Sequence, residues 1–181
     1  EHVWRAMDKS PKYKGSPDLA KLKQEAAEKY FFGIDKELDL VKIAKAYMAI
    51  VGDGRGGIVQ QNSLHVPQDF GGRARTLFVE GDQFRKFDVV LTNPPFGSKI
   101  KVLKDDASTF ALGHTWRRQG GRWVQSDKAK NTAPQVLFIE RCLQMLKDGG
   151  LLAIVLPETF FHAPNSKHIL QFMKDGNNIK A

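Results

Sequence analysis

Asn93, Pro94, Pro95 and Phe96 place an amide, two rigid backbone carbonyls and an aromatic ring within four consecutive positions. An amide oxygen and a carbonyl oxygen can each accept one hydrogen of an exocyclic amine on a planar base. Holding both hydrogens favours a pyramidal nitrogen, whose lone pair is then localised for attack on a methyl donor. A phenylalanine ring can stack on the base, which contributes roughly 1–3 kcal/mol. The spacing therefore suits methyl transfer to an amino nitrogen.

This segment directly follows a predicted strand. Residues Phe87 to Thr92 form a short apolar, β-branched run that is typical of a buried parallel strand. A proline has no N–H and a φ fixed at about −65°, so two prolines end the strand. In open α/β sheets, ligands bind at the carboxyl ends of strands. The alternative interpretation is an ordinary Asn-Pro turn with no chemistry.

The run Phe-Asp-Val-Val-Leu-Thr-Asn-Pro-Pro-Phe-Gly at residues 87–97 resembles the catalytic motif of amino-group DNA methyltransferases. It is most similar to the modification subunit of type I restriction-modification systems, over roughly residues 28–161. The resemblance implies methyl transfer from S-adenosylmethionine to adenine in DNA, after the base is flipped out of the duplex. It also implies specificity and restriction subunits as partners. Asn93, Pro94, Pro95 and Phe96 would form the catalytic site.

The composition indicates one soluble α/β domain over residues 1–181, within which residues 99–130 form a basic insertion. Hydrophobic residues make up 41% and charged residues 27%, which is ordinary for a globular protein. No apolar run is long enough to span a membrane, and no signal peptide is recognisable. Cys142 is the single cysteine, which excludes an internal disulfide and favours a buried structural thiol in a cytoplasmic setting.

Basic residues exceed acidic ones. The formal net charge is +8 and the isoelectric point is about 9.6, so the surface should attract a polyanion by releasing its counterions. Within the insertion, residues 115–124 predict a β-hairpin with a Gly-Gly turn. We expect Arg117, Arg118 and Arg122 to lie near DNA. For Trp116 and Trp123 we favour packing on the domain over contact with bases.

The remaining pattern alternates helices with strands. Helices are expected at residues 1–7, 18–29, 36–51, 134–147 and 165–174, and strands at 30–34, 57–61, 87–92 and 151–156, with a short strand or turn at 76–79. This order predicts βαβ units and a Rossmann-like, doubly wound, mostly parallel sheet. In the methyltransferase resemblance, the sheet lacks its first strand. A parallel sheet would bring the strand ends at Asp35, Asn62, Asn93 and Pro157 to one edge.

Two of these strand ends are candidates for binding the cofactor. Asp35, after Ile34, occupies the position where an acidic residue accepts hydrogen bonds from ribose hydroxyls in nucleotide-binding folds. Its alternative role is to cap the following helix. Asn62 and Ser63 follow the next strand, where the family often has an acidic residue that contacts the adenine of the cofactor. An amide can both donate and accept, and a turn is the alternative role for Asn62.

Three further features bear on the cofactor and on metals. The glycine-rich segment 52–57 lacks the ending of a phosphate-binding loop and predicts a flexible connection. No strand with a glycine-rich loop precedes Tyr30, although the family has one, and residue 1 is a glutamate. We therefore expect a fragment that binds the cofactor weakly. The five histidines have no metal-ligand spacing, so no metal is expected.

Two other functions stay open at this point. Asn-Pro-Pro followed by an aromatic residue also serves methylation of RNA bases and of protein glutamine side chains, because both present a planar amino group. Those enzymes more often carry tyrosine where this chain has Phe96. The third hypothesis is a non-catalytic binding module that keeps the methyltransferase fold and has lost the methyl-transfer activity.

Overall fold

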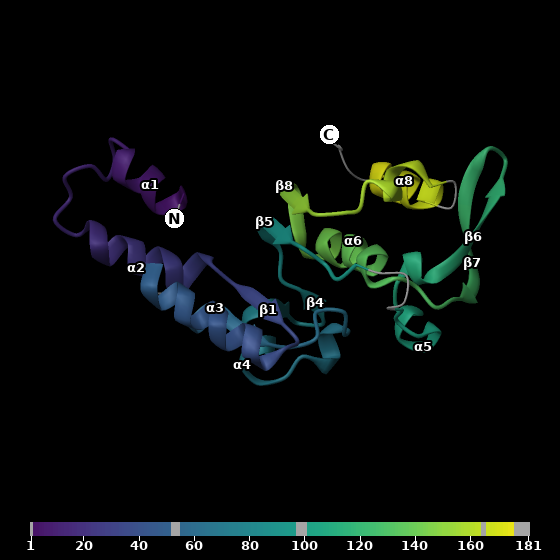
Figure 1. Cartoon of the computed structure of the whole chain (residues 1–181), viewed down its shortest axis with the longest axis horizontal. Coiled ribbons are helices and arrows are strands. Elements are labelled where there is room, and N and C mark those ends of the chain that lie inside the picture. Colours follow the sequence, from purple (N-terminus) through teal and green to yellow (C-terminus); the bar gives the residue numbers. More distant parts are fainter. Residues whose placement is uncertain (1, 52–54, 97–100, 164–165, 176–181) are drawn as a thin grey trace. The chain divides into compact units, whose positions relative to one another are not determined.

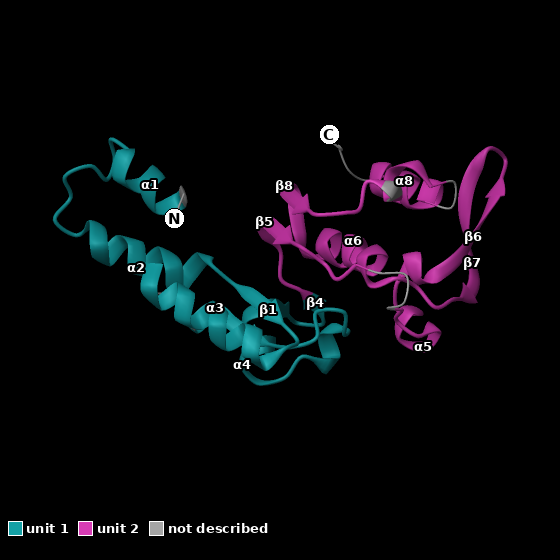
Figure 2. Ribbon diagram, viewed as in Figure 1, with its two compact units in different colours: residues 1–83 teal, residues 84–181 magenta. Residues whose placement is uncertain are grey.

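The computed structural model describes residues 2–51, 55–96, 101–163 and 166–175, and its contacts divide the chain into two compact units. Unit 1 comprises residues 1–83 and unit 2 residues 84–181 (Figure 2). Each unit contains one pair of parallel strands, so each has its own strand edge at which a site can form.

Unit 1 is built from helices around a short parallel strand pair. Its elements (Figure 1) are α1 (His2–Lys9), α2 (Leu19–Tyr30), β1 (Gly33–Asp35), α3 (Leu38–Val51), η1 (Arg55–Gly57), β2 (Ile58–Gln60), η2 (Pro67–Asp69), α4 (Gly72–Phe78) and β3 (Val79–Glu80), followed by β4 (Gln83–Phe84), in which the chain enters unit 2.

The parallel pair of unit 1 is shorter than expected. Gly33 pairs with Ile58 and Asp35 with Gln60, and α3 is the helix of the crossover between these strands. The strand predicted from Tyr30 is wrong over its first residues, because Tyr30 is the last residue of α2. The Phe31 ring instead packs on the Trp4 ring, and their centroids lie 5.5 Å apart. The Trp4 indole N–H also donates a hydrogen bond to the Val51 carbonyl at 2.7 Å.

Helix α4 includes residues 76–78 of the segment 76–79 for which the sequence predicted a short strand or turn, and Val79 begins β3. Ala74 and Phe78 lie one helical turn apart and are both buried, and the Phe78 ring contacts Phe32 edge-on at 6.1 Å. Arg73 donates to the Gly56 carbonyl at 2.6 Å, which ties α4 to η1. These contacts with distant parts of unit 1 favour the helix, and a short sequence window does not contain them.

Unit 2 places a helical layer on a second parallel pair. Its elements after β4 are β5 (Phe87–Thr92), α5 (Lys104–Ala107), η3 (Ala111–Gly113), β6 (His114–Gln119), β7 (Arg122–Ala129), α6 (Pro134–Met145), β8 (Leu146–Ile154), α7 (Thr159–His162) and α8 (Lys167–Lys174). The bounds of β5 confirm the strand predicted at residues 87–92.

Strand β8 begins earlier than predicted, directly after α6. Leu146 already pairs with Phe87, and the register then shifts so that Leu151 pairs with Val89. The helix predicted to extend to residue 147 therefore ends at Met145, and residues 148–150 form an irregular part of the strand. Gly149 takes a φ of +75° there, a conformation that favours glycine. The Lys147 ammonium binds the Asp88 carboxylate at 2.9 Å, which joins the two strands at this point.

The core of unit 2 lies between one face of the β5–β8 pair, the helices and the insertion. Its buried members are Leu112, Ile139, Phe160 and Ile169, and half-buried side chains of Trp116, Leu143, Ile154, Leu156 and Phe172 pack against them. Alternate residues along the two strands, Val89, Leu91 and Leu151, and Val155 directly after β8, are between 53% and 71% exposed. Parallel pairing in an α/β chain is thus confirmed, whereas one continuous doubly wound sheet stays a prediction.

Candidate functional site

The Asn-Pro-Pro-Phe segment lies at the carboxyl end of β5, as the sequence predicted. The parallel ladder ends at Thr92, whose carbonyl accepts a hydrogen bond from the Val155 N–H at 3.1 Å. The next residue, Asn93, is exposed, whereas Pro94 is buried and fixes the start of the loop. The Phe96 ring is 40% exposed. An amide and an aromatic ring are therefore accessible within four residues of each other.

Neither acceptor of this segment is used by the protein itself. Across the described residues, the Asn93 side chain and the Pro94 carbonyl receive no hydrogen bond. The neighbouring strand end at Pro157 lies at the same edge, because Thr92 pairs with Ile154 in the parallel register. Both acceptors proposed to hold an amine are therefore unoccupied by donors of the described residues, and Asn93 is the exposed one of the two residues.

The Asn93 amide oxygen is unoccupied for a local reason, which a comparison with two other strand ends explains. Asp35 Oδ1 accepts the N–H of Glu37 at 2.8 Å, and Asn62 Oδ1 accepts the N–H of Leu64 at 3.1 Å. Both side chains thus bond to the residue two positions ahead, the usual pattern of an Asx turn. Two positions after Asn93 stands Pro95, which has no N–H. The same turn cannot form there, so the amide oxygen stays available.

Asp35 and Asn62 lie at one edge of the β1–β2 pair, as expected for a cofactor site. Both side chains take the local capping or turn role that the sequence analysis gave as an alternative. Each of them also has a second polar atom that this hydrogen bond does not use. Among the residues that the structure describes, Asp35 Oδ2 and the Asn62 amide nitrogen have no hydrogen-bond partner. Ile34 and Ser63 are half-buried beside them. A carboxylate oxygen and an amide donor fit a ribose hydroxyl and an adenine ring, respectively.

All four strand ends were predicted to share one edge. The structure brings them together in pairs, with Asp35 and Asn62 in unit 1 and Asn93 and Pro157 in unit 2. Their union in one site stays a prediction. The predicted glycine connection at residues 52–57 lies partly outside the described residues, and its last part forms η1.

The insertion contains the predicted hairpin. Strands β6 and β7 are antiparallel, and Gly120 and Gly121 form the turn with φ of +57° and +83°. Both tryptophans pack on α8, since the ring centroids of Trp116 and Trp123 lie 5.8 Å and 5.9 Å from that of His168. The interpretation that placed the tryptophans on the domain is confirmed.

The three hairpin arginines differ in their surroundings. Arg117 and Arg118 are exposed and form no ion pair within the described part of the chain. Arg122 instead donates to both carboxylate oxygens of Asp175 at 2.9 Å. Sequence reasoning missed Asp175 and also Gln171, whose amide bonds the backbone of Trp123. Gln171 lies on the helix predicted at residues 165–174 and Asp175 directly follows that helix, so their spacing of four was the available signal.

Two searches of the described residues bear on the function. No group of three or more His, Cys, Asp or Glu side chains that could hold a metal ion occurs among them. No helix within the same residues has the length and apolar character needed to cross a bilayer.

Comparison with protein families identifies a family for this chain. The sequence model of the family described as Eco57I restriction-modification methylase matches residues 29–181. Comparison with individual curated proteins gives no match. The matched region includes the Asn-Pro-Pro-Phe segment and both strand pairs. The resemblance to restriction-modification methyltransferases is confirmed, and the narrower likeness to type I modification subunits stays a prediction. The chain therefore belongs to the Eco57I restriction-modification methylase family.

Proposed function

We propose that this protein transfers the methyl group of S-adenosylmethionine to the exocyclic amino group of adenine in DNA. Membership of the restriction-modification methylase family gives the reaction class, methylation of DNA. The observation that carries the finer assignment is the pair of unoccupied acceptors, Asn93 Oδ1 and the Pro94 carbonyl, at the end of β5. Their types and their positions in consecutive residues suit the two hydrogens of an aromatic amine.

The acceptors act on the reactivity of the amine. Its lone pair is delocalised into the ring, which makes the nitrogen a poor nucleophile. Asn93 Oδ1 and the Pro94 carbonyl each bind one N–H hydrogen, favour a pyramidal nitrogen and stabilise the positive charge that develops on it during attack. One N–H proton is then lost, which restores a neutral methylated amine. Phe96 stacks on the face of the base once the base has left the duplex.

The residues of unit 1 supply the contacts expected for the methyl donor. S-adenosylmethionine, when bound, supplies a methyl group on a sulfonium that the amine can attack. Asp35 Oδ2 is the acceptor for a ribose hydroxyl, and the Asn62 amide nitrogen is a donor toward the adenine ring. Ile34 and Ser63 flank these groups. The two unused polar atoms at the β1–β2 edge support this assignment.

The central test removes the amide acceptor. Asn93→Ala should lower kcat by about a hundredfold or more, because a preorganised polar group at the reacting atom is lost. Asn93→Asp, which keeps a side-chain oxygen, should retain part of the activity. Gln24→Ala is the matched control, because it removes an exposed amide from α2. Transfer of tritiated methyl groups is measured, together with the affinity for the cofactor, which should not change.

The same labelled cofactor identifies the substrate class. DNA, RNA and protein pools are offered in parallel, and the label should appear in DNA as N6-methyladenine. Label in RNA or on protein glutamine would instead support the hypothesis of an RNA-base or a protein-glutamine methyltransferase, respectively. Near-normal transfer by Asn93→Ala would rule out the role assigned to that amide.

A further inference from the structure

We propose that one face of the β6–β7 hairpin binds the phosphate backbone of duplex DNA, and that Gln171 on α8 is the positioning residue that holds this face in place. The face bears Arg117, Gln119, Arg122 and Val124, of which Arg122 is bound to Asp175, and it is called the free face below. This inference rests on the proposed function, because it takes DNA to be the substrate. It adds the surface that contacts the duplex and a residue that supports it without contacting DNA.

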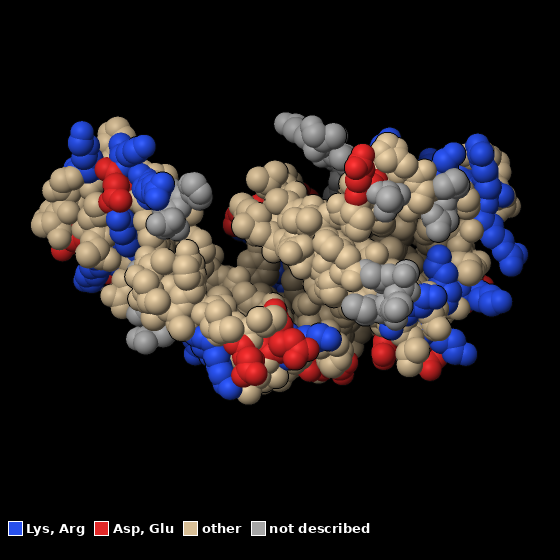
Figure 3. All heavy atoms as spheres, in the orientation of Figure 1, with Lys and Arg blue, Asp and Glu red and all other residues tan. Residues whose placement is uncertain are grey.

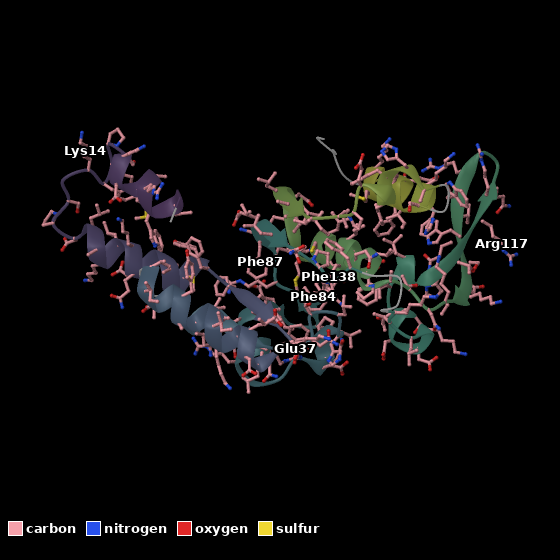
Figure 4. All side chains as sticks on the ribbon, viewed as in Figure 1. Lys14, Glu37, Phe84, Phe87, Arg117 and Phe138 are labelled. Atoms are coloured by element: carbon pink, nitrogen blue, oxygen red, sulfur yellow. The ribbon has the colours of Figure 1, made fainter. Side chains whose placement is uncertain are left out.

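Strand pairing separates the two faces of the hairpin. Arg117 pairs with Val124 and Arg118 with Trp123, and side chains opposite each other lie on the same face of an antiparallel pair. Trp123 therefore lies on one face and Val124 on the other. The tryptophan face is occupied, since Trp123 packs on His168 of α8. Arg117, Gln119, Arg122 and Val124 are all exposed on the opposite face, and Figure 4 shows Arg117 extending outward from β6.

The charge of the chain is concentrated in this region. The insertion at residues 99–130 carries eight lysines and arginines and three aspartates, whereas the rest of the chain carries twenty basic and seventeen acidic residues. Figure 3 shows Lys and Arg side chains gathered over the hairpin. Arg117 and Arg118 have no acidic partner among the described residues, so their guanidinium groups can neutralise phosphates. Most of the excess positive charge thus lies where a polyanion can reach it.

Gln171 holds the hairpin through its edge. Its Oε1 accepts the Trp123 N–H at 2.8 Å, and its amide nitrogen donates to the Trp123 carbonyl at 2.9 Å. These two backbone groups belong to the edge of β7, which would otherwise have unpaired donors and acceptors. Directly after the last residue of α8, and four residues beyond Gln171, Asp175 binds Arg122. Arg122 therefore serves this attachment, and Arg117 is the other arginine of the free face, with no acidic partner among the described residues.

The base of the insertion is also attached within unit 2. Glu140 on α6 accepts the N–H groups of Ala111 and Leu112 at 2.9 Å and 2.8 Å. Val102 and Thr132 form a reciprocal pair of backbone hydrogen bonds at 2.8 Å and 3.0 Å. The insertion is thus fixed at its base, and the hairpin is fixed at its outer part. A preorganised surface loses less conformational freedom when it binds, so its support contributes to affinity without touching the ligand.

The experiment separates contact from positioning by their salt dependence. Binding of the protein to a fluorescein-labelled, mixed-sequence DNA duplex is measured by anisotropy over a series of KCl concentrations. Arg117→Gln should reduce the slope of log affinity against log salt by about one, because one phosphate contact is lost. Gln171→Met keeps the length of the side chain and removes both hydrogen bonds. It should leave the slope unchanged and lower the affinity at every salt concentration by about tenfold or less.

Two controls accompany these variants. Lys42→Gln removes an exposed charge that is ion-paired with Asp39 on α3, and it should change neither slope nor affinity. Hydrogen exchange at residues 122–125 should accelerate in Gln171→Met and stay unchanged in Lys42→Gln. Arg117 is an exposed side chain, so its variant tests the free face even if Gln171→Met fails to fold.

Unchanged slope and affinity in Arg117→Gln would overturn the assignment of the free face. Accelerated exchange with wild-type affinity in Gln171→Met would overturn the positioning role. Methyl transfer to the same duplex, measured in parallel, separates this inference from the proposed function. If Arg117→Gln and Gln171→Met both bind and methylate DNA as the wild type does, this inference is wrong and the proposed function stands. If the wild-type protein neither binds nor methylates DNA, both the inference and the proposed function are wrong.

Discussion

Asn93 is available because of the residue two positions ahead of it. Asp35 and Asn62 show what a strand-ending side chain of this type does when position i+2 has an N–H, since each closes onto that donor. Pro95 withholds the donor, and the amide oxygen of Asn93 is left for another partner. The second proline of the motif therefore has a function distinct from that of Pro94, whose carbonyl is the other acceptor.

This account makes a prediction about Pro95. Pro95→Ala restores an N–H two positions after Asn93, which can then occupy Oδ1 in an Asx turn. Because one hydrogen bond is worth about 0.5–1.5 kcal/mol, kcat for methyl transfer should fall about three- to tenfold, although no group that contacts the substrate is removed.

A double-mutant cycle checks the cause of that loss. In an Asn93→Ala background, Pro95→Ala should have no further effect on kcat, because there is no amide left to occupy. Additive losses in the two backgrounds would show that Pro95 acts through backbone rigidity instead.

Among the elements, α6 has the largest share of buried polar groups in unit 2. Glu140 binds the base of the insertion, and the Arg141 guanidinium lies 4.0 Å and 4.8 Å from the ring centroids of Phe84 and Phe110. Cys142 follows directly and is 4% exposed. The helix thus connects the start of unit 2, the insertion and the core. The Cys142 thiol is part of the buried packing of this helix.

The thiol of Cys142 should be unreactive in the folded protein. Burial raises its pKa to about 12 from an ordinary 9.0, and the neighbouring Arg141 only partly opposes that shift. Because the thiolate is the reactive form, a pKa raised this far leaves almost none of it at pH 8. Absorbance with a disulfide reagent should therefore show no reaction at pH 8 until urea unfolds the chain.

Ser108→Cys provides the control for this measurement, because Ser108 is exposed in the same unit. The thiol that it introduces should react in the folded state, while Cys142 does not. Equal reaction rates for the two thiols in the folded protein would contradict the burial of Cys142.

At the scale of the whole molecule, the chain combines two strand pairs with a concentrated positive charge. Each strand pair has one site edge, and the insertion carries most of the net charge of +8. A ligand that binds only the folded state raises its stability by mass action. Electrostatic binding to DNA weakens as salt rises, because counterions gain less entropy when they are released into a more concentrated salt solution.

Duplex DNA should therefore raise the melting temperature of the protein at low salt, and the increase should shrink as KCl is added. Differential scanning fluorimetry measures both effects, with a neutral dextran as the control for crowding. A stabilisation by DNA that is independent of salt would contradict the electrostatic account.

The amino-acid sequence by itself determined the features that depend on neighbouring residues. The end of β5 at Thr92 follows from the prolines after Asn93, and the hairpin turn follows from two glycines that accept positive φ. The acceptors proposed to hold the amine could be predicted for the same reason. The amide and the rigid proline carbonyl that they require belong to four consecutive residues.

Only the tertiary structure decided the features whose partners are distant along the chain. Residues 146–150 join β8 because Phe87 and Asp88 offer backbone pairing and an ion pair there, and α4 forms because Phe78 packs on Phe32. The sequence pattern groups Arg122 with the other hairpin arginines, whereas the structure pairs it with Asp175, 53 residues further along the chain. Such contacts form only when the folded chain brings the partners together, so local sequence patterns do not contain them.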